Sequence, residues 1–394
     1  MDVLAAWYPE EANQTLGFTY MEYIVETNDI LINSVEGHIW VVHRGSCRGR
    51  PYFKTTRKID MVPELQQGDR LLNSMFDTEV LTGDGSSVAN TTTYGYITPS
   101  GKVHKARLDN EMVENGLAVA GTNVYMNTSP TGKNNKPNAP GYMYSLTVEG
   151  GEEGGIETRW RVPYDAGVKT ELDPGAVTSR GSGTTPALLA DKYVAIVDND
   201  SPRLHLNVYH QKPQANGNKQ LVCQVPLFTP EKVSVLNSVL GHYDSKREKY
   251  GIMIQNAYGA PPLYTGQNGQ KLNGKVNDMS NMEGGVTRVD VDKYGNCSVR
   301  WTNDLRIKAV SVLSTKNGLV YSYIQDGERA AKGEYVWYMA GIDWLTGETV
   351  FQVRTGTGGA FNDNWTGGAL GPDGTFYQTV SSGIVAIKDA CNNS

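Results

Sequence analysis

Short strand-like segments recur along most of the chain, and they come in groups of four. Segments of about five to eight residues, rich in Val, Ile, Tyr, Thr and Trp, are separated by Gly, Asn, Asp and Pro. Helical periodicity is nearly absent, and only residues 63–75 could form a turn or two of helix. Barrels and sandwiches also have short strands, but groups of four with longer gaps between them are typical of propeller blades.

Four such groups follow residue 114. Their strands are expected at 115–120, 123–127, 142–148 and 157–162; at 185–189, 193–198, 204–209 and 221–225; at 237–241, 251–256, 286–291 and 297–301; and at 309–313, 319–324, 338–344 and 349–353. The last group, 368–370, 375–380 and 383–387, has only three strands. We expect the N-terminal segment 18–25 to supply its outer strand and to close the ring, which removes free sheet edges.

We therefore predict an all-β protein in which residues 1–394 form a single β-propeller domain of four-stranded antiparallel blades. Seven blades are expected, with six or eight as the alternatives. Within the domain, we expect an N-terminal closing strand in 1–27, irregular early blades in 28–113, regular blades in 114–389 and a tail in 390–394.

One phrase carries a resemblance to a known family. The run Gly341-Ile-Asp343-Trp-Leu-Thr346-Gly347-Glu-Thr-Val-Phe351 resembles the Ala-x-Asp-x-x-Thr-Gly-x-x-x-Trp phrase of quinoprotein-like (PQQ-like) β-propellers, and residues 289–301 look like a looser copy. Asp and Thr-Gly suit a tight turn, and the aromatic residue packs between sheets. The stretches Gly181-Ser-Gly-Thr-Thr-Pro186 and Val197-Asp-Asn-Asp200 also resemble those of a group of secreted bacterial and fungal propeller proteins without assigned activity. The resemblance implies a fold, and no PQQ is expected, because the family's cofactor contacts are not found.

The charges and cysteines narrow the compartment and the partners. A net charge of −6 with both signs interspersed predicts neither nucleic acid nor membrane as a partner, and we expect a monomer. The first residues lack a signal peptide. The four cysteines are too far apart for a zinc or redox motif, and Cys47 is expected to pair with Cys391. We predict a secreted, disulfide-bonded glycoprotein from the cysteines and from sequons at Asn13, Asn90, Asn127, Asn199, Asn296, Asn364 and Asn392.

Candidate binding residues follow from blade geometry, because the first strand of a blade begins at the edge where the second strand ends. Residues at these positions are nearly all Asn, Asp or Thr. Such oxygen donors suit Ca²⁺, but they also cap turns or bind a polar substrate. The predicted metal ligands are Asp198, Asn199, Asn237 and Asn256, and the predicted substrate-binding residues are Asn115, Thr184, Thr185 and Asn364.

Three further residues are candidates for catalysis. His242 is a candidate general base on a first strand, although a half-buried histidine in a sheet is the structural alternative. Arg180 and Lys308 lie in equivalent loops and could stabilise a developing negative charge, or they could simply be solvated.

Three functions are consistent with these residues. The first is a secreted hydrolase or lyase that acts on a small polar or carbohydrate-like substrate at the channel mouth, with Ca²⁺ as a candidate cofactor. The second is a non-catalytic ligand- or protein-binding propeller, and the third is a quinone-dependent oxidoreductase. Fold class does not choose among them.

Overall fold

The computed structural model describes residues 4–16, 21–65, 71, 73–77, 79–84, 91–113, 115–167, 181–200, 202–215, 219–266 and 269–389, with only the backbone of 73–77, 79–84 and 91. Contacts between residues divide the chain into two units, Met1–Tyr164 and Asp165–Ser394, called here the N-terminal and the C-terminal unit. The prediction of a single domain over 1–394 stays a prediction.

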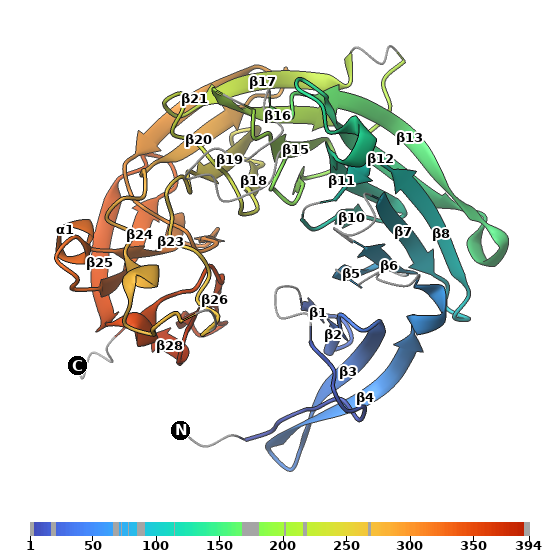
Figure 1. The fold of residues 1–394 in the computed structure, drawn as a ribbon, viewed down its shortest axis with the longest axis horizontal. Coiled ribbons are helices and arrows are strands. Elements are labelled where there is room, and N and C mark those ends of the chain that lie inside the picture. Colours follow the sequence, from blue (N-terminus) through green and yellow to red (C-terminus); the bar gives the residue numbers. More distant parts are fainter. Residues whose placement is uncertain are drawn as a thin grey trace. The chain divides into compact units, whose positions relative to one another are not determined.

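The N-terminal unit contains three antiparallel sheets whose strands pair in chain order (Figure 1). The first two sheets are regular, although residues 28–113 were expected to be irregular. The strands are β1 (Glu22–Ile24), β2 (Asp29–Asn33), β3 (His38–Cys47) and β4 (Arg50–Asp60); β5 (Asn73–Asp77), β6 (Glu79–Asp84), β7 (Thr91–Ile97) and β8 (Val103–Asp109); and β10 (Ala118–Ala120), β11 (Asn123–Pro130), β12 (Gly141–Glu149) and β13 (Gly155–Tyr164), with β9 (Glu111–Met112) paired to β11. The 3₁₀ turns are η1 (Val62–Glu64), η2 (Gly132–Asn134) and η3 (Gly151–Glu153).

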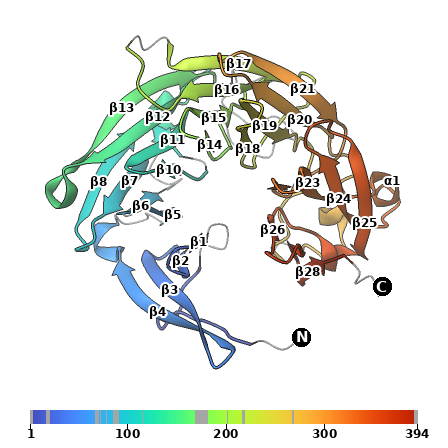
Figure 2. The same cartoon turned by 180° about the vertical axis from the view of Figure 1, so that it is seen from behind.

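The C-terminal unit continues the same plan with three sheets of four strands and one of three (Figure 2). The strands are β14 (Ala187–Leu189), β15 (Tyr193–Val197), β16 (Leu204–His210) and β17 (Leu221–Leu227); β18 (Leu240–Asp244), β19 (Lys249–Gln255), β20 (Val286–Val291) and β21 (Cys297–Asn303); β22 (Val312–Ser314), β23 (Leu319–Gln325), β24 (Val336–Asp343) and β25 (Thr349–Thr357); and β26 (Gly368–Leu370), β27 (Phe376–Val380) and β28 (Gly383–Ile387). Between them lie η5 (Lys275–Asn277), α1 (Gly327–Ala330) and η6 (Gly359–Phe361).

Two details correct the expected blade count and closure. The described residues form six blades of four paired strands, whereas seven complete blades were expected. Within the segment 18–25, Glu22–Ile24 pairs with β2 as the first strand of the first sheet. The expectation that this segment completes the last sheet is therefore wrong, and β26–β28 has three strands among the described residues.

Burial differs between the inner and the outer strands, and it explains their sequence patterns. The five residues of β15 are all buried, so this strand is a continuous apolar run, whereas the outer strand β4 alternates between exposed and half-buried positions. The cores lie between neighbouring sheets; one joins Val197 and Val208 to Ile252 and Val289. Each such side chain contributes about 1.5–3 kcal/mol by leaving water.

The tight turn expected from Asp343 and Thr346-Gly347 is confirmed, and it connects β24 to β25. Asp343 Oδ1 accepts hydrogen bonds from the N–H groups of Leu345 (2.9 Å) and Thr346 (2.8 Å). Gly347 has φ +79° and lies against the ring of Trp301, so that any side chain there would collide with the ring. The indole of Trp301 donates to the carbonyl oxygen of Trp344 (2.9 Å), which joins this turn to the preceding sheet.

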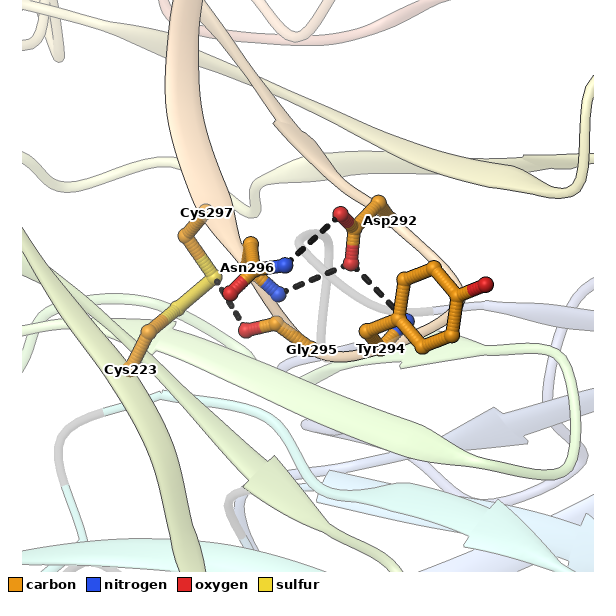
Figure 3. Close-up of a disulfide and its surroundings, with 6 residues drawn as sticks. All are labelled: Cys223, Asp292, Tyr294, Gly295, Asn296 and Cys297. Atoms are coloured by element: carbon orange, nitrogen blue, oxygen red, sulfur yellow. Dashed lines mark hydrogen bonds between the residues drawn. A yellow bond between two sulfur atoms is a disulfide. The ribbon is translucent and has the colours of Figure 1, made fainter.

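A disulfide joins two outer strands of the C-terminal unit. Cys223 of β17 is bonded to Cys297 at the start of β21, beside a turn in which Asp292 accepts from the backbone of Tyr294 and Asn296 (Figure 3). The prediction that the protein carries a disulfide is confirmed, but this pairing was not expected. Cys47 lies exposed at the end of β3 and Cys391 lies outside the described residues, so their pairing stays a prediction.

Candidate functional site

The loops at one edge of the sheets in the C-terminal unit contain most of the predicted site residues. Successive strands of each sheet are antiparallel, so the first strand begins, the second ends and the fourth ends at this edge. Its longest loop, residues 256–285, connects β19 to β20. Long loops of this kind often carry function.

The amide side chains at this edge bind the backbone of neighbouring loops. Asn199 accepts from the N–H of Val235 (3.1 Å) and donates to its carbonyl oxygen (3.3 Å). Asn364 does the same with Tyr264, at 2.7 and 3.0 Å. A side-chain amide has the same donor and acceptor as a peptide group, so each contact satisfies loop backbone that would otherwise lack partners.

Asn256 and Asn237 extend these contacts. Asn256 accepts from the backbone of Ser234 and Tyr258 and donates to the carbonyl oxygen of Lys232. Asn237 donates to the carbonyl oxygen of Lys308 (2.5 Å). The structure thus brings these candidates to one edge, as residues that hold loops together.

Three of the four predicted calcium ligands already accept hydrogen bonds from the protein. The side-chain oxygens of Asn199 and Asn256 already accept backbone N–H groups, from the adjacent residues Val235 and Ser234. Asp198 is fully buried and accepts from the His205 N–H (2.7 Å) and the Asn207 amide (2.9 Å). No group of three or more His, Cys, Asp or Glu residues in the part of the chain that the structure describes is arranged so that it could hold a metal ion. The calcium expectation stays a prediction, which elemental analysis would test.

Lys308 lies in a buried cluster immediately before β22. Its side chain is only 1% exposed, and its ammonium contacts Asp363 and the side-chain oxygen of Asn362 (2.6 Å). The Trp337 and Trp365 ring centroids lie 5.5 and 5.9 Å from Nζ. Burial lowers the pKa of Lys308, although Asp363 favours the charged form. An ammonium group enclosed in this way connects the two loops and is not accessible to a substrate.

The other predicted residues occupy structural positions or lie outside the description. The ring of His242 is half-buried against Trp344, at 6.3 Å between centroids, which is the structural alternative. Thr184 is buried and accepts from the N–H of Val197 (3.0 Å), and Thr185 beside it is half-buried. Asn115, in the N-terminal unit, accepts from the N–H of Gly116 (2.8 Å). Arg180 lies outside the described residues.

An Asp–His pair at this edge was not recognised in the sequence. His205 Nδ1 lies 3.4 Å from Oδ2 of Asp198, and the His205 side chain is 21% exposed. The carboxylate raises the pKa of His205. The sequence pattern that could have revealed this pair is an acidic residue at the end of the second strand of a blade, followed by a histidine early in the third strand.

A pocket of about 350 Å³ lies beside α1, and it contains none of the predicted residues. Its lining comes from α1 and the turn after it, from the facing ends of β24 and β25 and from the long loop: Asn273, Arg329, Gly333, Glu334, Tyr335, Val336, Arg354, Thr357 and Gly358. This volume is within the range of small-ligand sites.

The two arginines of this pocket differ in their partners. Arg329 lies near Asp326 (3.5 Å) and Glu334 (3.3 Å). Arg354 projects from β25, is exposed, and has no ion pair with any described residue. Tyr335 is 9% exposed, and burial raises its pKa, so its phenol stays protonated at neutral pH. The pocket therefore contains one guanidinium without a carboxylate partner among the described residues, beside the Arg329–Glu334 ion pair and the neutral phenol of Tyr335.

The wall of the pocket is fixed by backbone contacts. Gly358 has φ +82°, and its N–H donates to the carbonyl oxygen of Tyr335 (2.8 Å). Asn273 accepts from the N–H of Gly359 (2.8 Å), which ties the long loop to this wall. The lining is thus held in place without a ligand.

Comparisons with known proteins identify the fold. No family model matches the chain. A stretch of 257 residues is 23% identical to an uncharacterized protein of Archaeoglobus fulgidus and covers 59% of this chain and 46% of that protein, so the chain spans under half the length of this relative.

Among solved structures, the quinohemoprotein alcohol dehydrogenase of Comamonas testosteroni matches with a TM-score of 0.52 and 10% identity over 90% of this chain and 62% of that one. The WD40 domain of SCAP from fission yeast matches at 0.47 and 9% identity, over 93% and 83%. The first likeness shows the fold alone. With the sheets described above, it identifies the chain as an all-β protein of the β-propeller fold with four-stranded antiparallel blades.

Proposed function

We propose that the chain is a binding propeller that takes a small carboxylate-bearing ligand in the pocket beside α1. The observation that carries this proposal is Arg354, an exposed guanidinium without an ion pair in the wall of a preformed pocket. Guanidinium groups bind carboxylates through two parallel hydrogen bonds, and such charge-assisted bonds are about twice as strong as neutral ones.

Several predicted site residues at the loop edge are enclosed or engaged in hydrogen bonds, which supports ligand binding in the pocket over turnover at that edge. Lys308 is enclosed, and the amides of Asn199 and Asn364 are used by backbone. By contrast, the guanidinium of Arg354 is accessible in the pocket beside α1. It could bind a ligand there without any of the pocket residues taking part in a reaction.

Citrate is a suitable probe, with glycerol as the uncharged control. Citrate should raise the melting temperature in proportion to the logarithm of its concentration, because it binds only the folded chain. Arg354→Gln should remove this shift. Arg300→Gln is the matched control, since Arg300 is also exposed and lies on the outer strand of the preceding sheet, away from the pocket. An equal shift in Arg354→Gln, or an equal effect of glycerol, would refute the proposal.

The hydrolase or lyase prediction keeps one observation in its favour, the Asp198–His205 pair. The buried Asp198 carboxylate raises the pKa of the His205 imidazole, which is partly exposed and so could exchange a proton with a substrate in general acid–base catalysis. Hydrolysis of simple lactones and esters, compared between the wild type and His205→Gln, would test it. Turnover that is lost in His205→Gln but kept in His242→Gln would place acid–base chemistry at this pair, and absence of turnover would leave the binding function alone.

A further inference from the structure

The β3–β4 hairpin of the N-terminal unit extends beyond its sheet. The neighbouring strand β2 pairs with β3 only from Ile39 to His43, whereas β3 and β4 pair as far as Cys47 and Arg50. The two-residue turn Arg48–Gly49 has φ +50° and +78°, which suits a tight hairpin turn. Figures 1 and 2 show this hairpin extending past β1 and β2.

This hairpin has a net positive charge, whereas the chain as a whole has a net negative charge. Residues 38–58 contain six Arg and Lys residues and no Asp or Glu, in a protein of net charge −6. At its base, Arg57 donates to carbonyl oxygens of residues 98 and 99, and Lys58 pairs with Glu11. The four cations nearer the tip are exposed and have no ion pair with any described residue: Arg44, Arg48, Arg50 and Lys54.

One face of the hairpin is covered and the other is open. Phe53 packs with Trp7 and Val42 in a small core, and the Trp7 indole donates to Thr55 (3.0 Å), so residues near the N-terminus cover this face. The strand register places Arg50, Tyr52 and Lys54 on the opposite face, where all three are exposed.

Tyr52 lies across the backbone of the hairpin. It pairs with Gly45, and a side chain at Gly45 would collide with the Tyr52 ring, so glycine allows the ring to lie flat. The ring is 40% exposed between Arg50 and Lys54, which are four residues apart and hence about 13 Å apart along the strand. The exposed Tyr52 ring could therefore stack on a ring of a ligand while the two unpaired cations beside it bind anionic groups on that ligand.

We infer that the open face of this hairpin binds an acidic polysaccharide. Its sulfate or carboxylate groups would pair with Arg48, Arg50 and Lys54, and a sugar ring would stack on Tyr52. The Cys223–Cys297 disulfide favours this polyanion over nucleic acid, because disulfides persist in oxidising compartments outside the cytosol. The inference is independent of the pocket beside α1.

The test is binding to immobilised heparin at several salt concentrations, with neutral dextran as the uncharged comparison. Arg48→Gln/Arg50→Gln/Lys54→Gln should weaken binding by about tenfold or more and lower the slope of log affinity against log salt, since fewer counterions are released. Tyr52→Ala should weaken binding and leave that slope unchanged, because stacking involves no counterion.

The matched control is Lys212→Gln/Lys316→Gln/Lys332→Gln, which removes the same charge from exposed sites of the C-terminal unit. An equal loss of affinity in this control would show a non-specific charge effect and overturn the proposal. Displacement of heparin by poly(dT) at equal phosphate and sulfate concentration would also overturn it, in favour of single-stranded nucleic acid. Melting temperatures near that of the wild type would confirm that the variants are folded.

Discussion

Two groups of cations show opposite relations between charge and burial. In the C-terminal unit, Lys308 is 1% exposed and surrounded by Asp363, Asn362 and two indole rings. In the N-terminal unit, the cations at the tip of the β3–β4 hairpin are exposed and unpaired among the described residues. An enclosed charge cannot reach a ligand, and its removal leaves its partner unpaired in the interior, whereas exposed charges add little to stability and are free to bind.

The largest expected effect is at Lys308. Lys308→Met should lower the free energy of unfolding by about 3–5 kcal/mol, because it leaves the Asp363 carboxylate buried without its cation. Denaturant unfolding measures this loss. Lys308→Met/Asp363→Asn removes both charges and should recover a large part of it. A double variant as unstable as the single one would show that the packing of Lys308 dominates instead.

The Cys223–Cys297 disulfide should give the next largest effect on stability. It cross-links two strands of the C-terminal unit, whereas no described disulfide joins the β3–β4 hairpin to its neighbours. Cys223→Ser/Cys297→Ser should lower the free energy of unfolding by about 2–4 kcal/mol, since the bond closes a loop of 74 residues. A reducing agent should destabilise the wild type and not this variant. Thiol titration that finds Cys223 free in the native protein would contradict the assignment.

The amide contacts at the loop edge should have a smaller effect. Asn364→Ala removes two hydrogen bonds to Tyr264 at a residue with φ +50°, and we expect a loss of about 1–3 kcal/mol. Asn364→Gly keeps the conformational freedom and removes the same bonds, so it isolates their contribution. If Asn364→Gly unfolds at the same denaturant concentration as the wild type, the amide contacts do not stabilise this edge.

The hairpin should give the smallest change in stability. Arg48→Gln/Arg50→Gln/Lys54→Gln should alter the free energy of unfolding by about 0.5 kcal/mol or less, because these side chains are solvated and unpaired. Thermal and denaturant unfolding measure it. A loss of several kcal/mol would mean that these cations have structural partners, and the contrast with Lys308 would fail.

The sequence predicted the strands more completely than the site. Alternation of apolar residues and the Asp–Gly turns locate most strands of the C-terminal unit, because both signals are local. The three strands of the last group were also predicted, but the fourth strand expected from residues 18–25 pairs with the first sheet instead. Strand pairing at the ends of a chain depends on distant backbone, which no local pattern encodes.

The candidate site shows the same limit. Blade geometry correctly placed Asn199, Asn237 and Asn256 at one edge, but not what their amides bind. Asn364 pairs with Tyr264, 100 residues away, so the sequence alone does not show whether its oxygen is available. The Cys223–Cys297 bond, however, was accessible in principle, because the predicted groups place both cysteines on fourth strands of neighbouring sheets.

The structure shows which of the predicted glycosylation sites are exposed. The sequons at Asn127, Asn199 and Asn364 lie on residues that are buried or bound to backbone, whereas Asn13 and Asn296 are exposed. Glycosylation and secretion stay predictions, and the disulfide is compatible with both. No helix in the described ranges is long and apolar enough to cross a bilayer.

The net charge of the whole chain did not reveal the positive charge of the β3–β4 hairpin, because an average over 394 residues does not show a local run of cations.

The long loop between β19 and β20 has a consequence for local motion. Asn273 binds Gly359, Asn277 binds Asn362, Tyr264 binds Asn364, and the Trp365 indole donates to Pro261. The N–H groups of Tyr264 and Gly359 each donate to a side chain of the opposite segment, so each must lose this contact before it exchanges with solvent. We therefore expect these two amide protons to have similar protection in native-state hydrogen exchange.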